Sequence, residues 1–372
     1  MALHKKLKAK QANKYSKIQL SIFALTFIAI GGYFIVSSLA ANSPTRSPYA
    51  LGCVSGAANV TSVSGLRNAV LNGQSACVTA AVDDVDLSTI KLSNPVYIGT
   101  NGGSIGAVSM VGSKNIVIRQ ARIRSIDIRD SQFITIEKST LGGTSSNSVL
   151  DNLITSLGYS PGVDTSDDVT IQDNDIGWTS ADNSGNTGYG IRVYGGDRFK
   201  VLRNYIHHIG ADGIQMGSDG ADNIIDRNEI AYVAPPSTSN EHSDDIQVTG
   251  HGPNLQITNN YLHHNGWLDV NGPNSGGSGP YIHGGSGTNS LLFENNLVRD
   301  ERNFMQVADL GTGGTSISRL TFRRNTFYNN GTMWPDGTDL SWQIASGSNN
   351  LYERNVVNDS FGNKYGFGSH TS

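Results

Sequence analysis

The sequence predicts an all-β solenoid, a single parallel β-helix, and three observations favour this fold. Segments in the middle of the chain repeat one another, since VLRNYI returns as IIDRNEI and again as QITNNYL. Apolar residues in these segments alternate with polar ones, which is the period of a strand and not of a helix. Repetition every few tens of residues is typical of architectures in which each repeat forms one coil of a stack.

A column of asparagines marks the repeats. Each lies three residues after an inward apolar residue, and Ala121 and Ser139 take this place in two earlier coils. Successive positions are 18 to 36 residues apart, so the extra residues belong to loops of varying length. Stacked amides can bond to one another, which satisfies polar groups that are costly to bury. We therefore expect one ladder of Asn174, Asn204, Asn228, Asn260, Asn296, Asn325 and Asn355.

The N-terminus forms a separate unit. Six lysines precede an apolar run from Ile18 to Ala41, and Ser38-Leu39-Ala40 offers small residues for cleavage. This pattern predicts either a cleaved signal peptide or a membrane anchor, and both alternatives stay open. In either case the remaining chain is secreted or anchored at the outer face of the cytoplasmic membrane. We expect the boundaries 1–41 for the signal or anchor, 42–52 for a linker, 53–95 for an N-terminal cap and 96–372 for the β-helix.

The cap is predicted to hold a disulfide and a short helix. Cys53 and Cys77 are the only cysteines, and in an exported chain such a pair is most simply bonded. Between them, Ser64 is expected to cap a helix that ends at Gly73. Its buried face would consist of Leu66, Ala69 and Val70.

The charge of the exported part restricts the partners. Without the six N-terminal lysines the chain has 21 basic and 31 acidic residues, a net charge of −10. This argues against nucleic acid as the main partner, because phosphate binding requires a basic surface. An acidic polysaccharide is not excluded, because a basic cleft can lie on an acidic protein. We expect a monomer that contacts the membrane only through its N-terminal segment.

One polar residue per coil is expected to point outward from the second strand of each repeat. Such a row could follow a polymer, or its amides could simply bond to one another, and both interpretations stay open. Tyr194 and Asp245 are further candidates for contact with a substrate, and Asp245 is expected to face outward beside the row. The row itself would consist of Arg192, Gln215, Gln247, His283, Gln306 and Gln343.

Acidic and imidazole side chains gather near that row. Seven of the nine histidines lie between positions 207 and 283. Histidine can act as a base near neutral pH, and paired carboxylates can hold a hard cation such as calcium. No fixed ligand spacing indicates zinc. The candidates are His242 and the aspartates Asp212, Asp244 and Asp245.

The VTI-x-x-N-x-I coils, the segments DGIQ and HSDDIQ and the capped start resemble the right-handed parallel β-helix proteins of the pectin-lyase-like superfamily. The resemblance extends from about Val54 to the end and implies a polysaccharide lyase. In such lyases acidic residues often bind calcium, which neutralises the substrate carboxylate, while a base removes the α-proton. Asp212, Asp244 and Asp245 would suit the first role, and His242 or Arg192 the second.

Two other functions remain open. A non-catalytic glycan-binding or adhesin-type β-helix needs only the outward polar row and aromatic residues in the loops. A glycoside hydrolase is a minor alternative, because Asp244-Asp245 and Gly250-His251-Gly252 are similar to its motifs. In hydrolases of that type the two motifs lie on successive coils, whereas here only four residues separate them.

Overall fold

The computed structural model divides the chain into two units, Met1–Ser47 and Pro48–Ser372. All described residues belong to the second unit, so the predicted signal or anchor segment lies outside them. No helix within the described residues is long and apolar enough to span a membrane. The structure describes residues 50–142, 152–157, 166–177, 188–217, 220–233, 243–250, 252–263, 277–283, 290–299, 306–308, 319–328 and 351–358.

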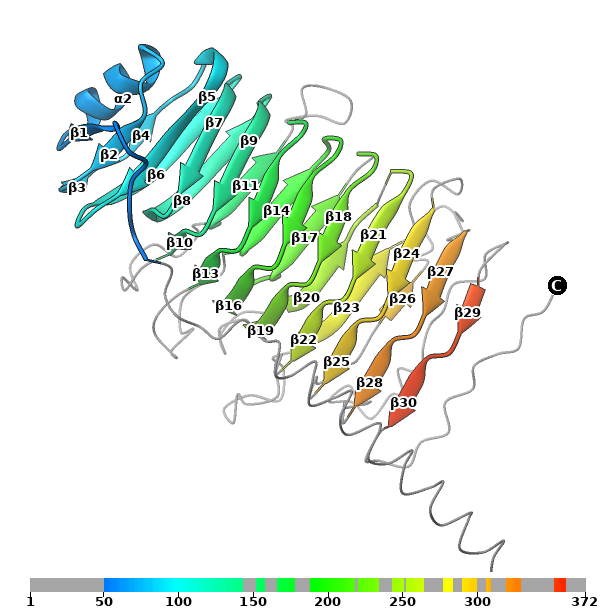
Figure 1. The fold of residues 1–372 in the computed structure, drawn as a ribbon. Coiled ribbons are helices and arrows are strands. Elements are labelled where there is room, and N and C mark those ends of the chain that lie inside the picture. The colour runs from blue at the N-terminus through cyan, green and yellow to red at the C-terminus, as the bar shows by residue number, and fades with distance from the viewer. Residues whose placement is uncertain are drawn as a thin grey trace, which may run out of the picture. The chain divides into compact units, whose positions relative to one another are not determined.

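The second unit is a parallel β-helix built from three sheets (Figure 1). From β9 to β26 each coil adds one strand to each sheet, and all pairs between described strands are parallel. The first sheet contains β1 (Ala58–Val60), β2 (Ala76–Val78), β5 (Lys91–Thr100), β7 (Lys114–Arg119), β9 (Gln132–Glu137), β12 (Thr170–Gln172), β15 (Lys200–Leu202), β18 (Ile224–Asp226), β21 (Leu255–Thr258), β24 (Leu291–Glu294), β27 (Leu320–Arg323) and β29 (Leu351–Glu353).

The second and third sheets separate after the early strands β3 (Ala81–Val82), β4 (Val85–Asp86), β6 (Ser104–Val111) and β8 (Arg122–Arg129). The first half of β8 pairs with β10, and its second half pairs with β11. The second sheet continues through β10 (Thr140–Leu141), β13 (Asp175–Gly177), β16 (Tyr205–Ile209), β19 (Glu229–Val233), β22 (Tyr261–His263), β25 (Leu297–Arg299), β28 (Thr326–Tyr328) and β30 (Val356–Asn358).

The third sheet positions the candidate site. It begins with β4 and the second halves of β6 and β8, which pair in that order. It continues through β11 (Ile154–Leu157), β14 (Ile191–Tyr194), β17 (Ile214–Gly217), β20 (Ser243–Val248), β23 (Gly277–His283) and β26 (Gln306–Ala308).

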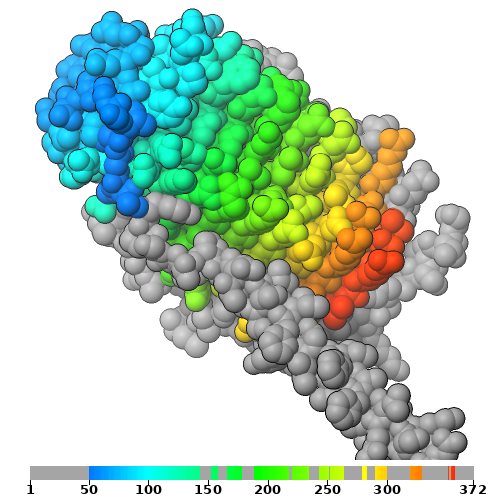
Figure 2. Space-filling view, viewed as in Figure 1, coloured from blue at the N-terminus to red at the C-terminus, as the bar shows by residue number. Residues whose placement is uncertain are grey.

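The core lies between the sheets and consists of apolar residues stacked in register. β-branched residues dominate it, since their stiff side chains pack well on a pleated surface. In the space-filling view successive coils form bands of colour, each against the next (Figure 2). One fully buried column of the first sheet runs through Ile118, Ile136, Ile171, Val201, Ile225, Ile257, Phe293 and Phe322.

The predicted asparagine ladder is confirmed at the turn between the first and second sheets. The side-chain amide of Asn228 donates to Asn260 Oδ1 at 3.0 Å and to the Val201 carbonyl at 2.9 Å. Its own oxygen accepts from the backbone N–H and the amide of Asn204, at 2.9 and 3.0 Å. Ser139 extends the ladder, because its backbone N–H donates to Asn174 Oδ1. The same pattern links Asn174, Asn204, Asn228, Asn260, Asn296, Asn325 and Asn355.

The residue before each asparagine has a left-handed backbone, with φ between 53° and 57°. This conformation costs a non-glycine residue roughly 1 kcal/mol. The ladder bonds on the following residue hold each turn in that conformation. The positions are Asp173, Arg203, Arg227, Asn259, Asn295, Arg324 and Arg354.

The capping helix α2 (Val63–Leu71) is confirmed, and its buried residues are Leu66, Ala69 and Val70 as predicted. Its N-cap is Ser62 and not Ser64: Ser62 has an extended backbone, and its side chain accepts from the Gly65 N–H at 3.1 Å. Ser64 lies inside the first turn, where its backbone is already helical. The helix ends at Leu71 with Asn72 as its C-cap, and Gly73, the expected stop, follows with a left-handed φ of 69°.

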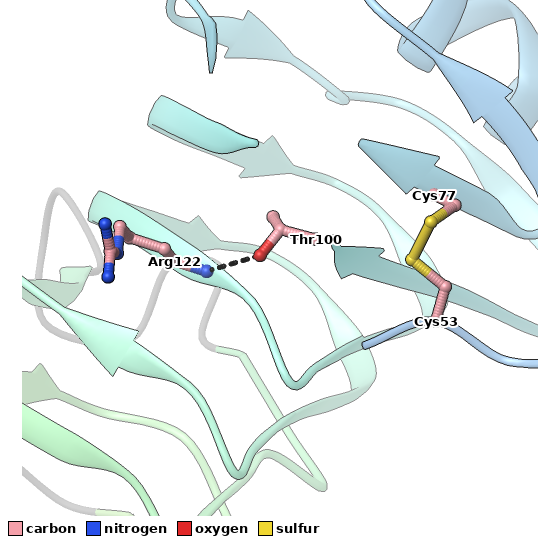
Figure 3. The surroundings of a disulfide bond; sticks show 4 residues. All are labelled: Cys53, Cys77, Thr100 and Arg122. Atoms are coloured by element: carbon pink, nitrogen blue, oxygen red, sulfur yellow. Dashed lines mark hydrogen bonds between the residues drawn. A yellow bond between two sulfur atoms is a disulfide. The ribbon is translucent and has the colours of Figure 1, made fainter. Parts of the chain in front are cut away.

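The disulfide between Cys53 and Cys77 is confirmed (Figure 3). Cys77 lies in β2, which pairs with both β1 and β5. Strand stacking therefore starts at Ala58, closer to the N-terminus than the boundary expected at residue 96. Nearby, the Thr100 hydroxyl accepts from the Arg122 backbone N–H at 3.1 Å, which ties the end of β5 to β8.

We expect Asn228→Ala to lower the free energy of unfolding by about 3 kcal/mol, because it leaves buried donors and acceptors on both neighbouring coils without partners. Urea unfolding followed by circular dichroism measures the change. The control is Asn72→Ala, an exposed helix-end residue, with an expected effect below about 0.5 kcal/mol. Equal effects of the two substitutions would show that the ladder does not stabilise the fold.

The double substitution Cys53→Ser with Cys77→Ser is expected to cost about 3 kcal/mol, since the disulfide closes a loop with a sequence separation of 24 residues. Reduction of the native protein should lower its melting temperature by the same amount as the substitutions do. An unchanged melting temperature after complete reduction contradicts this role.

Candidate functional site

One outward position of the third sheet keeps register through nine successive strands. We call these residues the polar row: Asp86, Ser109, Asp127, Thr155, Arg192, Gln215, Gln247, Tyr281 and Gln306. The sequence correctly placed Arg192, Gln215, Gln247 and Gln306 in one line. It missed the first four members, because the early coils lack the repeated G-I-Q signature.

The prediction that His283 belongs to the row is wrong. Tyr281 pairs with both Gln247 and Gln306, while His283 pairs with Ala308. The alignment failed because Ile282 was matched to the first inward residue of the neighbouring strand, whereas it pairs with the second, Val248. Gln343, the last predicted member, lies outside the described residues.

The guanidinium of Arg192 lies over two tyrosine rings. Its guanidinium carbon is 4.5 Å from the centroid of the Tyr189 ring and 5.2 Å from that of Tyr194. Its Nε is buried and has no hydrogen-bond partner in the part of the chain that the structure describes. Aromatic faces attract a cation without using its N–H groups. The arrangement therefore holds a planar cation whose donors suit a carboxylate.

Beyond Arg192 the polar row is a network of amides. The Tyr194 hydroxyl donates to Gln215 Oε1 at 3.1 Å, and the Gln215 amide donates to Gln247 Oε1. Gln215 and Gln247 are only 5% and 6% exposed. Of the two interpretations of the row, mutual bonding therefore describes these two residues.

Asp212 and Asp244 anchor that network. They accept from Gln215 and Gln247 at 3.1 and 3.2 Å, so each aspartate holds the glutamine three residues later. The second oxygen of Asp212 accepts from the backbone N–H of Asp244 at 2.9 Å, which confirms that the two lie on adjacent coils. Both are buried, and Asp245 is fully buried, although it was expected to face outward.

The contacts of these aspartates concern their predicted role as calcium ligands. Among the residues that the structure describes, no group of three or more histidine, cysteine, aspartate and glutamate side chains is placed to hold a metal ion. The oxygens of Asp212 instead bind N–H groups of the chain. Calcium stays a prediction and enters no step of the function proposed below.

The histidines are distributed over different parts of the chain. His242, the predicted base, lies outside the described residues. His207 and His263 are on the second sheet, where their Nε2 atoms lie 2.7 Å from Asp175 and 3.1 Å from Glu229. The structure thus brings Arg192, Tyr194 and the Asp–Gln pairs together and places these two histidines on another sheet.

Tyr281 follows Gln247 in the polar row. It is 8% exposed, and burial, followed by the nearby Asp244 carboxylate, raises the pKa of Tyr281 to about 12. Both causes disfavour the phenolate, so the Tyr281 hydroxyl stays protonated across the physiological range.

Comparison with known proteins supports the fold. The family described as "Right handed beta helix region" matches residues 140–317. This match confirms the predicted right-handed parallel β-helix fold. No curated protein matches the sequence.

Several solved structures are similar over most of their length. An alginate lyase from Paenibacillus sp. is 13% identical, with 81% of this chain and 98% of that chain covered and a TM-score of 0.49. The Streptococcus pneumoniae surface protein and adhesin PfbA is 10% identical, with 82% and 96% covered and a TM-score of 0.48. The periplasmic alginate epimerase AlgG is 14% identical, with 80% and 83% covered and a TM-score of 0.45. At these identities the likeness concerns the fold alone.

The raised pKa of Tyr281 predicts a loss of stability at high pH. From pH 10.0 to about 12 the tyrosine ionises in the unfolded chain and not in the folded one, so the free energy of unfolding falls as the pH rises. The expected loss is up to roughly 2 kcal/mol. Urea unfolding at about pH 9 and about pH 11.5 should show a smaller decrease for Tyr281→Phe than for the native protein. Identical decreases would contradict the prediction.

Proposed function

Because this chain is a right-handed parallel β-helix protein, we propose that it binds a uronate-containing polysaccharide along its third sheet. The single observation that carries the proposal is the Arg192 guanidinium, which lies over two tyrosine rings and forms no ion pair with any described residue. A guanidinium presents two parallel N–H donors that match the two oxygens of a carboxylate.

The negative net charge of the chain makes a cation on the third sheet, Arg192, a specific indication of an anionic ligand. The sequence after the N-terminal lysines has a net charge of −10. A general electrostatic attraction would therefore not bring an anion to this face, whereas a local, partly buried arginine can. Contact with the Tyr189 and Tyr194 rings also limits the motion of the guanidinium, which reduces the entropy lost when it binds a ligand.

We propose β-elimination as the reaction. A base takes the proton from C5 of a uronate unit, the bond from C4 to the glycosidic oxygen breaks, and a C4–C5 double bond forms while the departing oxygen takes up a proton. Arg192 would hold the uronate carboxylate and stabilise the negative charge that develops on it. His242, which immediately precedes β20 in the sequence, is the proposed base.

Glycan binding without catalysis is the second candidate. It is favoured by the buried and mutually bonded Gln215 and Gln247, whose anchors Asp212 and Asp244 serve the network in the described structure. Both candidates use the same face. Both also suit an exported protein, since a disulfide such as Cys53–Cys77 persists in an oxidising compartment.

The test uses hexamers of galacturonate and of mannuronate with the native protein, Arg192→Ala and Arg192→Lys. Calorimetry should show binding to the native protein that is at least about tenfold weaker in Arg192→Ala, with partial recovery in Arg192→Lys. Arg122→Ala, which removes an exposed arginine of β8, is the matched control and should bind normally.

Ultraviolet absorbance of the unsaturated product distinguishes the two candidates. Absorbance that grows with the native protein and is lost in His242→Ala supports elimination. Binding without any unsaturated product supports the non-catalytic candidate. Failure of the native protein to bind either hexamer contradicts the proposed function.

A further inference from the structure

The third sheet holds a groove at its N-terminal end that the proposed function does not use. It has a volume of about 810 Å³ and is lined by residues of β4, β6, β8 and β11 and by Asp84 and Asn152. The first four members of the polar row, Asp86, Ser109, Asp127 and Thr155, all line it. No residue of this groove was a candidate in the sequence.

The charges in and beside the groove are balanced. Each of its three carboxylates lies near an arginine: Asp84 is 2.9 Å from Arg124, Asp127 is 2.6 Å from Arg129, and Asp86 is 3.9 Å from Arg67. Hydrogen bonds from Ser88 hold the pKa of Asp86 below its usual value, so this carboxylate is ionised. The groove is therefore strongly polar but carries no net charge from these pairs.

Some polar groups of the groove form no hydrogen bond with the described residues. The hydroxyls of Ser125 and Thr155 make no hydrogen bond to another described residue. Asn152 accepts from the Tyr189 N–H at 3.1 Å through its oxygen, and its amide nitrogen donates to no other described residue. Ser125 and Thr155 lie on the adjacent strands β8 and β11, which are about 4.8 Å apart, and Asn152 precedes β11. A ligand here would thus meet donors and acceptors at short, regular intervals.

We propose that this groove binds a neutral sugar unit. Each hydroxyl of a pyranose both donates and accepts, so neighbouring hydroxyls match a carboxylate beside a guanidinium, a serine or threonine hydroxyl, and an amide. An anionic sugar would face the carboxylates of Asp84, Asp86 and Asp127. A cationic one would face Arg129, which also lines the groove, and would compete with Arg67 and Arg124 for their carboxylate partners. Only a neutral polyhydroxylated unit uses both kinds of group without an unfavourable charge.

The groove lies next to Arg192 along the polar row. Asp127, Thr155 and Arg192 are consecutive in the polar row, so the groove ends roughly 5 to 10 Å from the arginine. One glycan chain along the sheet would place neutral units in the groove and a uronate at Arg192. The natural ligand would then be a mixed polymer of neutral and uronic sugars. This extension to a mixed polymer rests on the proposed function. The binding of a neutral sugar in the groove does not depend on the proposed function.

Saturation-transfer difference NMR on the full-length protein tests the inference. The probes are the methyl glycosides of glucose, galactose, mannose and N-acetylglucosamine, with methyl galacturonoside as the anionic probe. Ser109→Trp fills the groove at a position three strands away from Arg192. Thr170→Trp, an outward residue of β12 on the first sheet, is the control for the introduced ring.

At least one neutral glycoside should give a signal with the native protein and with Thr170→Trp, and this signal should fall at least fivefold in Ser109→Trp. Arg192→Ala should lose the galacturonoside signal and keep the neutral one. The inference is overturned if no neutral glycoside binds, or if the neutral signal survives Ser109→Trp. A neutral signal without any galacturonoside signal would contradict the role of Arg192 alone.

Discussion

The asparagine ladder is the interaction on which the rest of this structure depends. Each buried amide bonds to the asparagine of the next coil and to a carbonyl of the preceding one, so three coils meet at every step. These bonds satisfy polar groups that would otherwise be costly in a dry interior. They also stabilise the left-handed residue that each turn needs, a conformation that these residues would rarely adopt alone.

A fixed turn has a consequence on the opposite side of the coil. With every coil held in the same register, one outward position of the third sheet lines up through nine strands as the polar row. The β-helix thus places nine side chains in one row. The chemical properties of each position in the row depend on the residue type found there. A charge-balanced groove, a cation over aromatic rings and a buried amide network follow one another.

The predicted site shows what repetition can and cannot reveal. Gln215 and Gln247 were found because each follows an aspartate and an isoleucine in the same pattern, and that pattern reflects a real contact, the aspartate three residues earlier. The same repetition made Asp212 and Asp244 resemble a functional cluster, because similar residues recur from coil to coil. In the structure they accept hydrogen bonds from Gln215 and Gln247. Where the pattern changed, at His283, the alignment shifted and failed.

The sequence by itself determined the strands, the ladder and the capping disulfide. Inward residues recur with the period of a strand, and a single asparagine per coil is visible without any knowledge of distant contacts. Only the tertiary structure decided which outward residues are accessible. Asp245 shares the outward parity of Gln247 and is fully buried, while Thr155 lines an open groove. The exposure and the hydrogen bonds of a side chain depend on neighbouring coils, which are 18 to 36 residues away in the sequence. A local sequence pattern does not encode which side chains those coils place beside it.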